Sequence, residues 1–472
     1  MNPAWVEDLA DEVGATPVSA AALLADYRQD TWPLAIKQSV LDEPLGHPDV
    51  VVRPSSAAEV ARLLTFAVDR GIPVVAWGLG SSVVGAPMAT EGGIVCDLSE
   101  LEGILALSEE DMLVTVRAGM RGDTLEAELN RHGLTLGHSP QSLDRSTVGG
   151  WVATRATGQF SSRYGGIEDL VVALEVALPA HGLVRTPLVP RPSLGPDLAG
   201  LLVGSEGTLG IVTEVTLRVA PLAEHRVLEA FCFDDVGPLI ECMRQISQLG
   251  VRPFLVRGYD RAETGHLTHG EAEGCALLLG NEGHQAVTDA AHAACADVVA
   301  AQGGRSLGSA LVEAWMHRRY DFSTIEQIVA RPGGYAETIE VAALWSGVAE
   351  LHSALTVTLA DHADAVWGHF SHIYPQGTSL YVILTGQADD DRTAVERIRA
   401  IWDTAMRVCY DEGSAIAHHH GVGLARRAWL GTALGSTVAP LRAIKAALDP
   451  AGICNPGKLT DPPTDEQRGA TR

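Results

Sequence analysis

Three consecutive histidines form the strongest chemical signal in this sequence. His418, His419 and His420 stand in the stretch GSAIAHHHGVG and run directly into a glycine turn. Imidazole titrates near neutral pH and also ligates metals, so such a run suits either proton transfer or metal binding. On an extended strand, His418 and His420 would share one face and His419 would point the other way. We therefore expect that the three rings do not converge on one metal ion.

A second stretch with ionisable side chains, WGHFSHIYPQGTSLY, lies upstream of the histidine run. It supplies His369 and His372, either of which could act as the distant ligand of a metal site formed with two residues of the run. It also supplies Tyr381, and a phenol can relay a proton to or from an imidazole. The two stretches together suggest acid–base chemistry.

Glycines and hydroxyls follow a buried strand in the stretch IPVVAWGLGSSVVGAP, at Gly78, Gly80, Ser81 and Ser82. A Gly-x-Gly after a strand suggests a dinucleotide fold with Asp97 as the ribose acid. However, the third glycine is misplaced, and a proline and several glycines occupy the place where the phosphate-binding helix would begin. The stretch instead predicts a turn whose backbone N–H groups hold a pyrophosphate without a helix.

Two further stretches repeat this composition, namely SPQSLDRSTVGGWVATRATGQFSSRYGGIEDLV and VGSEGTLGIVTEVTL. Glycine permits close backbone approach, and serine and threonine donate to phosphate and ring heteroatoms. Three such segments could line one elongated ligand.

The order of these segments resembles the flavin-binding domain of the vanillyl-alcohol oxidase superfamily. The motifs DRSTVGGWVATRATGQ, YGGIEDL, GSEGTLGIVTE and HHHGVG are similar to those of the alkyldihydroxyacetone-phosphate synthase family. The resemblance covers about residues 45–459. It implies bound FAD, held without a covalent bond, because Ser81, Ser82 and Val83 stand where many relatives carry a flavin-linked histidine. The FAD contacts implied by position are Ala76, Trp77, Gly78, Leu79, Gly80, Ser81, Ser82, Val83, Pro140, Ser146, Thr147, Gly149, Gly150, Ala153, Thr154, Ala156, Glu206, Gly207, Gly210, Ile211 and Val212.

The same resemblance implies roles for residues outside the cofactor segments. In the synthase family, flavin N5 captures the substrate carbon, the acyl group leaves and a long-chain alcohol attacks. A tyrosine and the histidine run act as acids and bases beside the flavin, and these roles fall on Tyr381 and on His418, His419 and His420. Arg257 matches an arginine near the active site, and Arg319 has a weaker claim as a substrate contact.

Two departures from known patterns bear on metal and substrate. Related FAD-linked 2-hydroxy-acid dehydrogenases carry GEHGIG and GH-x-GDGNLH, in which a glutamate and two histidines are available to a metal. Here His419 replaces the glutamate and Tyr381 replaces the last histidine. Because two of the possible metal ligands are lost, we expect no metal. His369 is retained and is a candidate for the substrate site. Glu326 stands where synthases carry an arginine for the substrate phosphate, and a glutamate would repel a phosphate.

Three hypotheses on function follow. The favoured one is a flavoenzyme similar to alkyldihydroxyacetone-phosphate synthase. The alternative is an FAD-linked oxidase or dehydrogenase of a hydroxy acid or another alcohol, which Glu326 and the bacterial-style NPGKL ending favour. The third is a non-catalytic flavin- or metal-binding scaffold, against which the complete FAD motifs and the histidine run argue.

The predicted fold is α+β, with a PCMH-type FAD-binding domain of two subdomains and a ferredoxin-like α+β cap, suggested by two successive β-α-β units after Pro221. The predicted boundaries are 1–45 for an N-terminal helical segment, 46–222 for the FAD-binding domain, 223–440 for the cap, 441–459 for a return to the FAD domain, and 460–472 for a disordered tail.

Composition narrows the partners and the location. The formal net charge is -25, with 59 acidic and 34 basic residues, which argues against nucleic acid as a partner. The seven cysteines are odd in number and scattered, as in a reduced cytoplasmic protein. No signal peptide and no transmembrane run are apparent. We expect a cytoplasmic enzyme, compatible with a homodimer, that acts on a small-molecule or lipid-like substrate.

Overall fold

The computed structural model describes residues 5–15, 17–18 and 21–459, so the predicted disordered tail lies outside the described residues. The chain begins with the short helices that the sequence predicts. These are α1 (Trp5–Val13), α2 (Ala21–Leu24) and α3 (Pro33–Val40). No helix among the described residues is long and apolar enough to cross a membrane.

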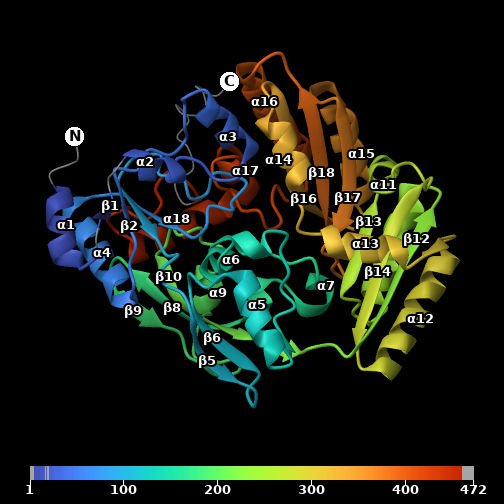
Figure 1. Ribbon diagram of the computed structural model, residues 1–472, viewed down its shortest axis with the longest axis horizontal. Helices are drawn as coiled ribbons and strands as arrows, with labels where there is room; N and C mark the ends of the chain where they lie inside the picture. Colours follow the sequence, from blue (N-terminus) through green and yellow to red (C-terminus); the bar gives the residue numbers. More distant parts are fainter. Residues whose placement is uncertain (1–4, 16, 19–20, 460–472) are drawn as a thin grey trace.

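Two sheets form the half of the molecule that contains the glycine-rich segments (Figure 1). The first has the order β1 (Pro17–Val18), β2 (Val50–Val52), β4 (Ile94–Asp97), β3 (Val74–Trp77). The second is antiparallel, with the order β5 (Ile104–Ser108), β6 (Leu113–Arg117), β10 (Ile211–Arg218), β8 (Val171–Leu178), β9 (Gly182–Arg185). Their buried aliphatic side chains share one core with helix α4 (Ala57–Arg70), so the two sheets pack as one unit.

Local signals explain several boundaries in this half. Ser56 caps α4 by accepting a hydrogen bond from the backbone N–H of Glu59, and Gly71 ends the helix in the left-handed conformation. The connections between strands carry α5 (Gly122–Arg131), α6 (Val148–Thr154), α7 (Ser161–Tyr164), α8 (Ile167–Leu170), α9 (Leu198–Leu202), and the small β7 (Leu134–Thr135) and β11 (Ala220–Pro221) pair.

The cap is a seven-stranded sheet. Its order is β15 (Arg305–Gly308), β12 (His225–Phe233), β14 (Cys275–Gly283), β13 (Leu255–Tyr259), β17 (Ala365–Ser371), β18 (Gly377–Gln387), β16 (Gly334–Leu344). The first four strands, with α10 (Val236–Gln248) and α12 (Gln285–Ala301), run β-α-β-β-α-β in the chain, which is the predicted ferredoxin-like unit.

Side chains alternate between the two faces of the cap sheet along its central strands. One face is covered by helices, and the other, called the site face below, carries the candidate site residues. Phe370, Leu380 and Val382 lie in the core with α10, α15 (Val348–Leu359) and α16 (Asp391–Asp411). Successive strand residues point to opposite faces, so His369 and Tyr381 project from the other face. They are also paired in register across β17 and β18.

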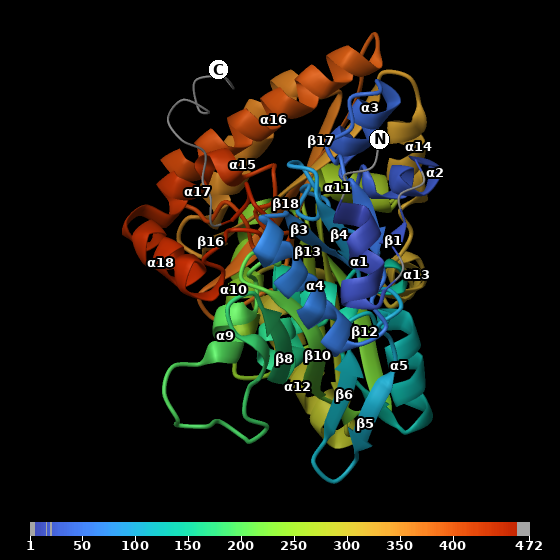
Figure 2. The same cartoon turned by 90° about the vertical axis from the view of Figure 1, so that its left-hand side faces the viewer.

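Two details differ from or extend the predicted elements. The sequence AWMHRRYDFSTIEQIV predicts one long helical stretch. The structure divides it into α13 (Ala310–Arg318) and α14 (Ser323–Ala330), because the Asp321 carboxylate accepts from the backbone N–H of Ser323. After α17 (Arg427–Leu434), α18 (Val438–Leu448) brings the chain back to the FAD-binding half (Figure 2). There Lys445 donates to the carbonyl of Thr208 at 2.7 Å.

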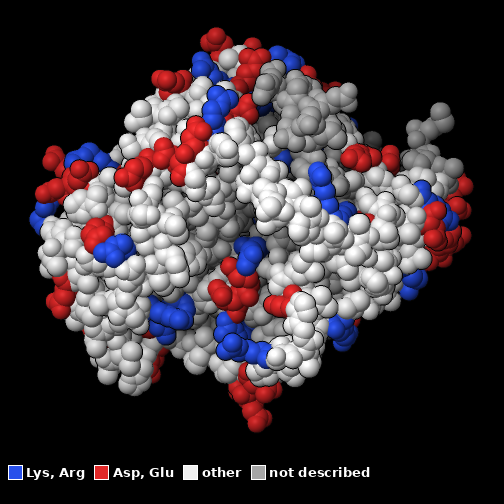
Figure 3. Space-filling view, turned by 180° about the vertical axis from the view of Figure 1, so that it is seen from behind, with Lys and Arg blue, Asp and Glu red and all other residues white. Residues whose placement is uncertain are grey.

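The outer surface carries intermingled charges. On the face opposite to that of Figure 1, basic side chains are scattered among acidic ones and form no continuous stripe (Figure 3).

Candidate active site

The turn after β3 has the conformation expected of a pyrophosphate cradle. No helix follows Trp77, and Gly80 adopts φ +68°. Among the described residues, the backbone N–H groups of residues 79–83 donate to no protein acceptor. The turn is held from outside, because Thr31 N–H donates to the carbonyl of Ser82 at 3.0 Å and Gly85 N–H donates to Asp30 at 2.8 Å. Free donors on a fixed turn fit an anionic cofactor group.

The other two glycine-rich segments lie against this turn. A Cβ atom on Gly78 would come within 2.6 Å of Thr147 Oγ1, and a Cβ on Gly207 would lie 3.6 Å from the Ala76 side chain. Thr147 caps α6 by accepting from Gly150 N–H at 3.2 Å. The three segments therefore meet, although they are far apart in the chain.

The remaining predicted FAD contacts fall on the same segments. Pro140 and Ser146 flank a short 3-10 turn, Gly149 and Thr154 belong to α6, Ala156 follows it, Gly210 precedes β10, and Ile211 and Val212 begin that strand. Buried polar atoms without a protein partner, such as both ring nitrogens of His138 and Nδ1 of His420, leave donors and acceptors available to a bound molecule. These residues fit FAD.

Asp97 has no free carboxylate for a ribose. It accepts from Tyr27 Oη at 2.7 Å and from Arg53 Nε at 2.8 Å. This pairing agrees with the rejection of the dinucleotide-fold interpretation.

The side chain of Glu206 links the cofactor segments to the histidine run. Its two oxygens accept from the backbone N–H groups of Val422 and Gly423, at 2.5 and 3.0 Å. The carboxylate of Glu206 is therefore engaged by the protein, and the contacts left to the cofactor at this position are those of the backbone.

The histidine run is a turn and not a strand, which makes the expected alternation of side chains wrong. The fully buried carboxylate of Glu340, on β16, accepts from the backbone N–H groups of His418, His419 and His420 at 3.2, 2.8 and 3.4 Å. This anchor bends the backbone, and His418 Nδ1 meets His419 Nδ1 at 2.8 Å. Arg426 lies 3.5 Å from the same carboxylate.

Tyr381 connects the cap strands to this turn. Its hydroxyl lies 3.1 Å from His419 Nε2 and 3.2 Å from His372 Nε2. The His369 ring stacks on the Tyr381 ring with centroids 4.6 Å apart, and the His420 ring meets it edge-on at 5.7 Å. A phenol between two imidazoles can pass a proton in either direction.

Burial controls the protonation of the cluster. It lowers the pKa of His420 to about 3 and lowers the pKa of His372 and His419, so these rings are neutral near pH 7. Burial also raises the pKa of Tyr381 well above its ordinary value, and nearby Glu340 adds to this effect. Burial alone would raise the pKa of Glu340, but the surrounding imidazoles lower it well below the ordinary value, so this carboxylate is ionised. The neutral rings of His372, His419 and His420 and a protonated phenol therefore lie over a fixed negative charge.

His369 and Arg257 lie on the same face of the cap sheet and contact each other. A side chain that binds substrate needs a free polar atom, and His369 has protein partners at both ring nitrogens. His369 is 3% exposed and uses both ring nitrogens, with Nδ1 2.9 Å from Glu263 and Nε2 2.6 Å from Arg257. Both ring nitrogens of His369 are thus occupied by protein partners, and its role at the substrate site stays a prediction. Arg257 is partly exposed and lies beside Tyr259 and Ser371.

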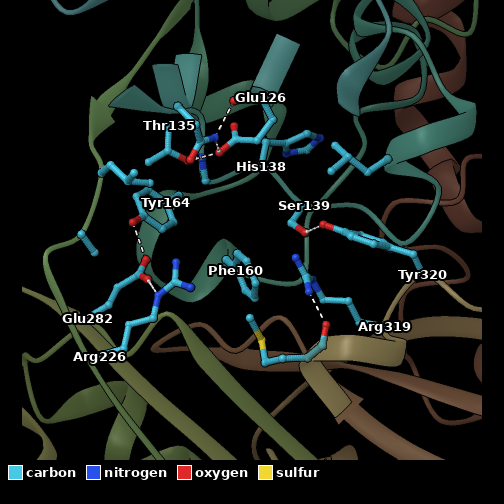
Figure 4. A pocket seen from close by; sticks show the side chains of 16 residues that line it. Glu126, Thr135, His138, Ser139, Phe160, Tyr164, Arg226, Glu282, Arg319 and Tyr320 are labelled. Carbon is cyan, nitrogen blue, oxygen red and sulfur yellow. Dashed lines mark hydrogen bonds and ion pairs between the residues drawn. The ribbon is translucent and has the colours of Figure 1, made fainter. Parts of the chain in front are cut away.

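A polar pocket lies between the two halves of the molecule. It has a volume of about 230 Å³ and is lined by residues of α5, α7 and α13, of strands β7, β12 and β14, and of neighbouring loops. Arg319 projects into it beside Phe160 and Tyr320, and Glu282 joins Tyr164 and Arg226 on the opposite wall (Figure 4). Its wall carries the predicted substrate residue Arg319.

Glu326 does not line this pocket. It lies on α14, is exposed, and pairs with Arg145 at 2.8 Å. This pairing neutralises much of the repulsion that a lone glutamate would exert on a phosphate.

Strand β16 supplies a carboxylate, that of Glu340, beside the histidine run, where the sequence motif has none. Ligand atoms of Glu340, His418 and His419 lie within 4.8 Å of one another, a group that could hold a metal ion. Its Glu340 oxygens are already engaged by three backbone N–H groups, which reduces their capacity for a metal. The expectation of no metal stays a prediction.

Several residues of the site had no local sequence signal. Glu340, Glu263, Tyr374 and Ser161 enter through long-range contacts, including Ser161 Oγ to His372 Nδ1 at 2.9 Å and Tyr374 Oη to His418 Nε2 at 2.8 Å. Glu340 could have been predicted only from the strand pairing that places it opposite Tyr381.

Comparison with known proteins agrees with an FAD-binding chain. Residues 48–186 match a family model described as an FAD binding domain, and residues 222–459 match the C-terminal domain of FAD linked oxidases. An uncharacterized FAD-linked oxidoreductase of Escherichia coli, YgcU, is 31% identical over 432 residues, covering 87% of this chain and 89% of that protein. Alkyldihydroxyacetonephosphate synthase of Dictyostelium discoideum is 28% identical over 448 residues, covering 87% and 73%.

Solved structures share the fold. One of an alkyldihydroxyacetonephosphate synthase superposes with a TM-score of 0.81 at 24% identity, covering 97% of this chain and 86% of the other. One of p-cresol methylhydroxylase gives 0.77 at 16% identity, covering 97% and 96%. The predicted PCMH-type α+β fold is thus confirmed.

Fold, cradle and relatives together define an FAD-dependent enzyme. The chain belongs to the FAD-linked oxidase family.

Proposed function

We propose that the enzyme takes a proton from a substrate hydroxyl through Tyr381 and passes it to His419, in a reaction similar to that of alkyldihydroxyacetonephosphate synthase. The observation that carries the proposal is the position of the Tyr381 hydroxyl within hydrogen-bond distance of His419 and His372. The 28% identity to a synthase over most of the chain supports the reaction type.

The protein residues have separable tasks in this reaction. The turn at residues 79–83 and its two neighbouring segments would hold FAD without a covalent bond. When bound, FAD supplies an electrophilic ring for the reacting carbon or hydride. Tyr381 holds its proton at rest, and neutral His419 accepts it when the substrate hydroxyl is deprotonated. His418 and His420 shape the turn and its polarity. Arg257 supplies a positive charge on the same face of the cap sheet as Tyr381.

A net oxidation is the second candidate. The charged lining of the pocket, including Arg226 and Arg319, favours a small polar alcohol or hydroxy acid over a long alkyl chain. The same tyrosine and imidazole would remove the hydroxyl proton, and bound FAD would supply the acceptor for the hydride of the carbinol carbon. The E. coli relative described as an FAD-linked oxidoreductase supports this reaction class.

One experiment separates the two reactions. The FAD-loaded enzyme is incubated with acyl-dihydroxyacetone phosphate and a labelled long-chain alcohol, and separately with a panel of 2-hydroxy acids, while oxygen uptake and dye reduction are recorded. Labelled ether product without oxygen or dye consumption supports the synthase reaction. Dye reduction by a hydroxy acid without ether product overturns it in favour of oxidation. A Tyr381→Phe enzyme that turns over normally would overturn the acid–base assignment in both cases.

A further inference from the structure

Three side chains form a hydrogen-bonded series on the site face of the cap sheet. Glu263, on α11 (Arg261–Leu267), lies 2.9 Å from His369 Nδ1 through both carboxyl oxygens. His369 Nε2 lies 2.6 Å from Arg257 Nη2. Glu263 and His369 are 7% and 3% exposed, while Arg257 is only half-buried. The series runs from the interior toward an accessible cation.

The donors and acceptors in this series can be assigned from their chemistry. A guanidinium has donors and no acceptor, so His369 Nε2 must accept the hydrogen bond from Arg257. A neutral imidazole that accepts at one nitrogen carries its proton on the other, so Nδ1–H donates to Glu263. The carboxyl of Glu263 therefore fixes the tautomer that Arg257 requires.

Arg257 retains its positive charge in this arrangement. Its other partners are the Tyr259 hydroxyl at 2.8 Å and the Ser371 hydroxyl at 3.5 Å, both neutral. No carboxylate within the described parts of the chain forms an ion pair with it. Burial raises the pKa of Glu263 to about 8, so even this second neighbour carries little negative charge at neutral pH.

We propose that Glu263, acting through His369, positions Arg257 as an unneutralised cation that binds the anionic group of the substrate, a carboxylate or a phosphate. This inference rests on the proposed function, since it assigns the substrate of the same site a negative charge. Glu263 and His369 are positioning residues, and Arg257 alone touches the anion. The guanidinium suits both oxyanions because its fork of N–H donors matches their geometry.

The site is tested first by anion binding to the FAD-loaded enzyme. Inorganic phosphate and oxalate are titrated in separate calorimetric experiments, which also distinguish the two oxyanions. We expect Arg257→Met to weaken binding of the preferred anion roughly tenfold to hundredfold, as for loss of a hydrogen bond to a charged group. Glu263→Ala should weaken it roughly tenfold, because the imidazole then loses its fixed tautomer. Glu263→Gln should restore binding, because the amide oxygen still accepts from Nδ1–H.

A matched control lies in the same sheet. Glu229 makes the same kind of contact with His292, at 2.8 Å, and Glu229→Ala should leave anion affinity unchanged. Unchanged affinity in Glu263→Ala, or an equal loss in Glu229→Ala, would overturn the proposal. If Glu263→Ala does not fold, nitrogen-15 spectra of wild-type His369, assigned by the His369→Gln variant, decide the matter. A protonated Nδ1 and an unprotonated Nε2 support the proposal, and the reverse overturns it.

The inference and the proposed function fail in different ways. Tyr381→Phe should abolish turnover and keep anion affinity, whereas Glu263→Ala should raise KM with a smaller effect on kcat. Normal turnover in Tyr381→Phe with intact anion binding would overturn only the acid–base function. Absence of phosphate and oxalate binding in the wild-type enzyme would overturn only the anion site.

Discussion

The carboxylate of Glu206 accepts a hydrogen bond from the backbone N–H of Gly423 at 3.0 Å, across 217 positions of the chain. This contact joins a cofactor segment of the FAD-binding half to the turn that carries the three histidines. It fixes the distance between the segments predicted to hold FAD and the turn for which we propose proton transfer.

Loosening this contact should impair catalysis before it impairs cofactor binding. In Glu206→Gln the amide NH₂ would face one of the two backbone N–H groups that the carboxylate now accepts, at a cost of about 1–3 kcal/mol in unfolding free energy. We expect turnover to fall roughly tenfold while bound FAD, read from its visible absorbance, stays near one per chain. Glu214→Gln, on the same β10 strand, serves as the control. Full activity in Glu206→Gln would contradict the coupling.

The Tyr381 hydroxyl should be essential for turnover. Tyr381→Phe keeps the ring that stacks on His369 and removes only the relay between His372 and His419. We expect a loss of about 10²–10⁴-fold in kcat, the usual contribution of a positioned acid or base. The flavin spectrum should be unchanged. Tyr374→Phe, which removes the hydroxyl that contacts His418, should have the smaller effect of the two.

The flavin should dissociate from the denatured chain. The turn after β3 carries Ser81, Ser82 and Val83, none of which forms a stable covalent bond to a flavin ring. Precipitation with acid should therefore release all yellow colour into the supernatant as FAD. Colour that stays with the protein pellet would show a covalent link and refute this prediction.

Removal of divalent metals should leave activity intact. The Glu340 oxygens are taken by the backbone of the histidine turn, and His418 and His419 contact each other. We expect dialysis against EDTA to preserve turnover and elemental analysis to find much less than one metal per chain. A stoichiometric metal whose loss in Glu340→Gln accompanies loss of activity would assign the cluster to metal binding.

Glu337 should make stability depend on pH. Its Oε2 accepts from the indoles of Trp32 and Trp402, at 2.9 and 2.8 Å, and burial raises its pKa from 4.5 to about 7. The folded state holds the proton more tightly than the unfolded state, so this stabilisation is complete below pH 4.5 and is lost as pH rises through 7. Glutamine does not titrate. The unfolding free energy of wild type minus that of Glu337→Gln should therefore fall on the order of 3 kcal/mol between acidic and mildly alkaline pH.

Denaturant titrations at several pH values measure this difference directly. A difference that stays constant with pH would show that Glu337 keeps the same charge in both states.

Some of the fold follows from local signals. Ser56 with Glu59, and Gly71, mark the ends of α4 because caps depend on neighbouring residues alone. The alternating stretch after Gly210 predicts β10 for the same reason. The long helical stretch predicted over residues 314–329 is wrong, because the Asp321 side chain accepts a backbone N–H between the two helices.

The sequence by itself determined the cofactor class and the glycine turn without a helix, and it named the histidines and the tyrosine as acid–base candidates. These depend on residue types and short spacings. Only the tertiary structure decided how the histidines are arranged, because the carboxylate of Glu340 that bends their backbone comes from another strand. The tertiary structure also decided the partners of His369. Its ring contacts Arg257 and Glu263, and Glu263 lies 106 positions away in the chain. Contacts of this kind depend on strand pairing, which no local pattern of residues encodes.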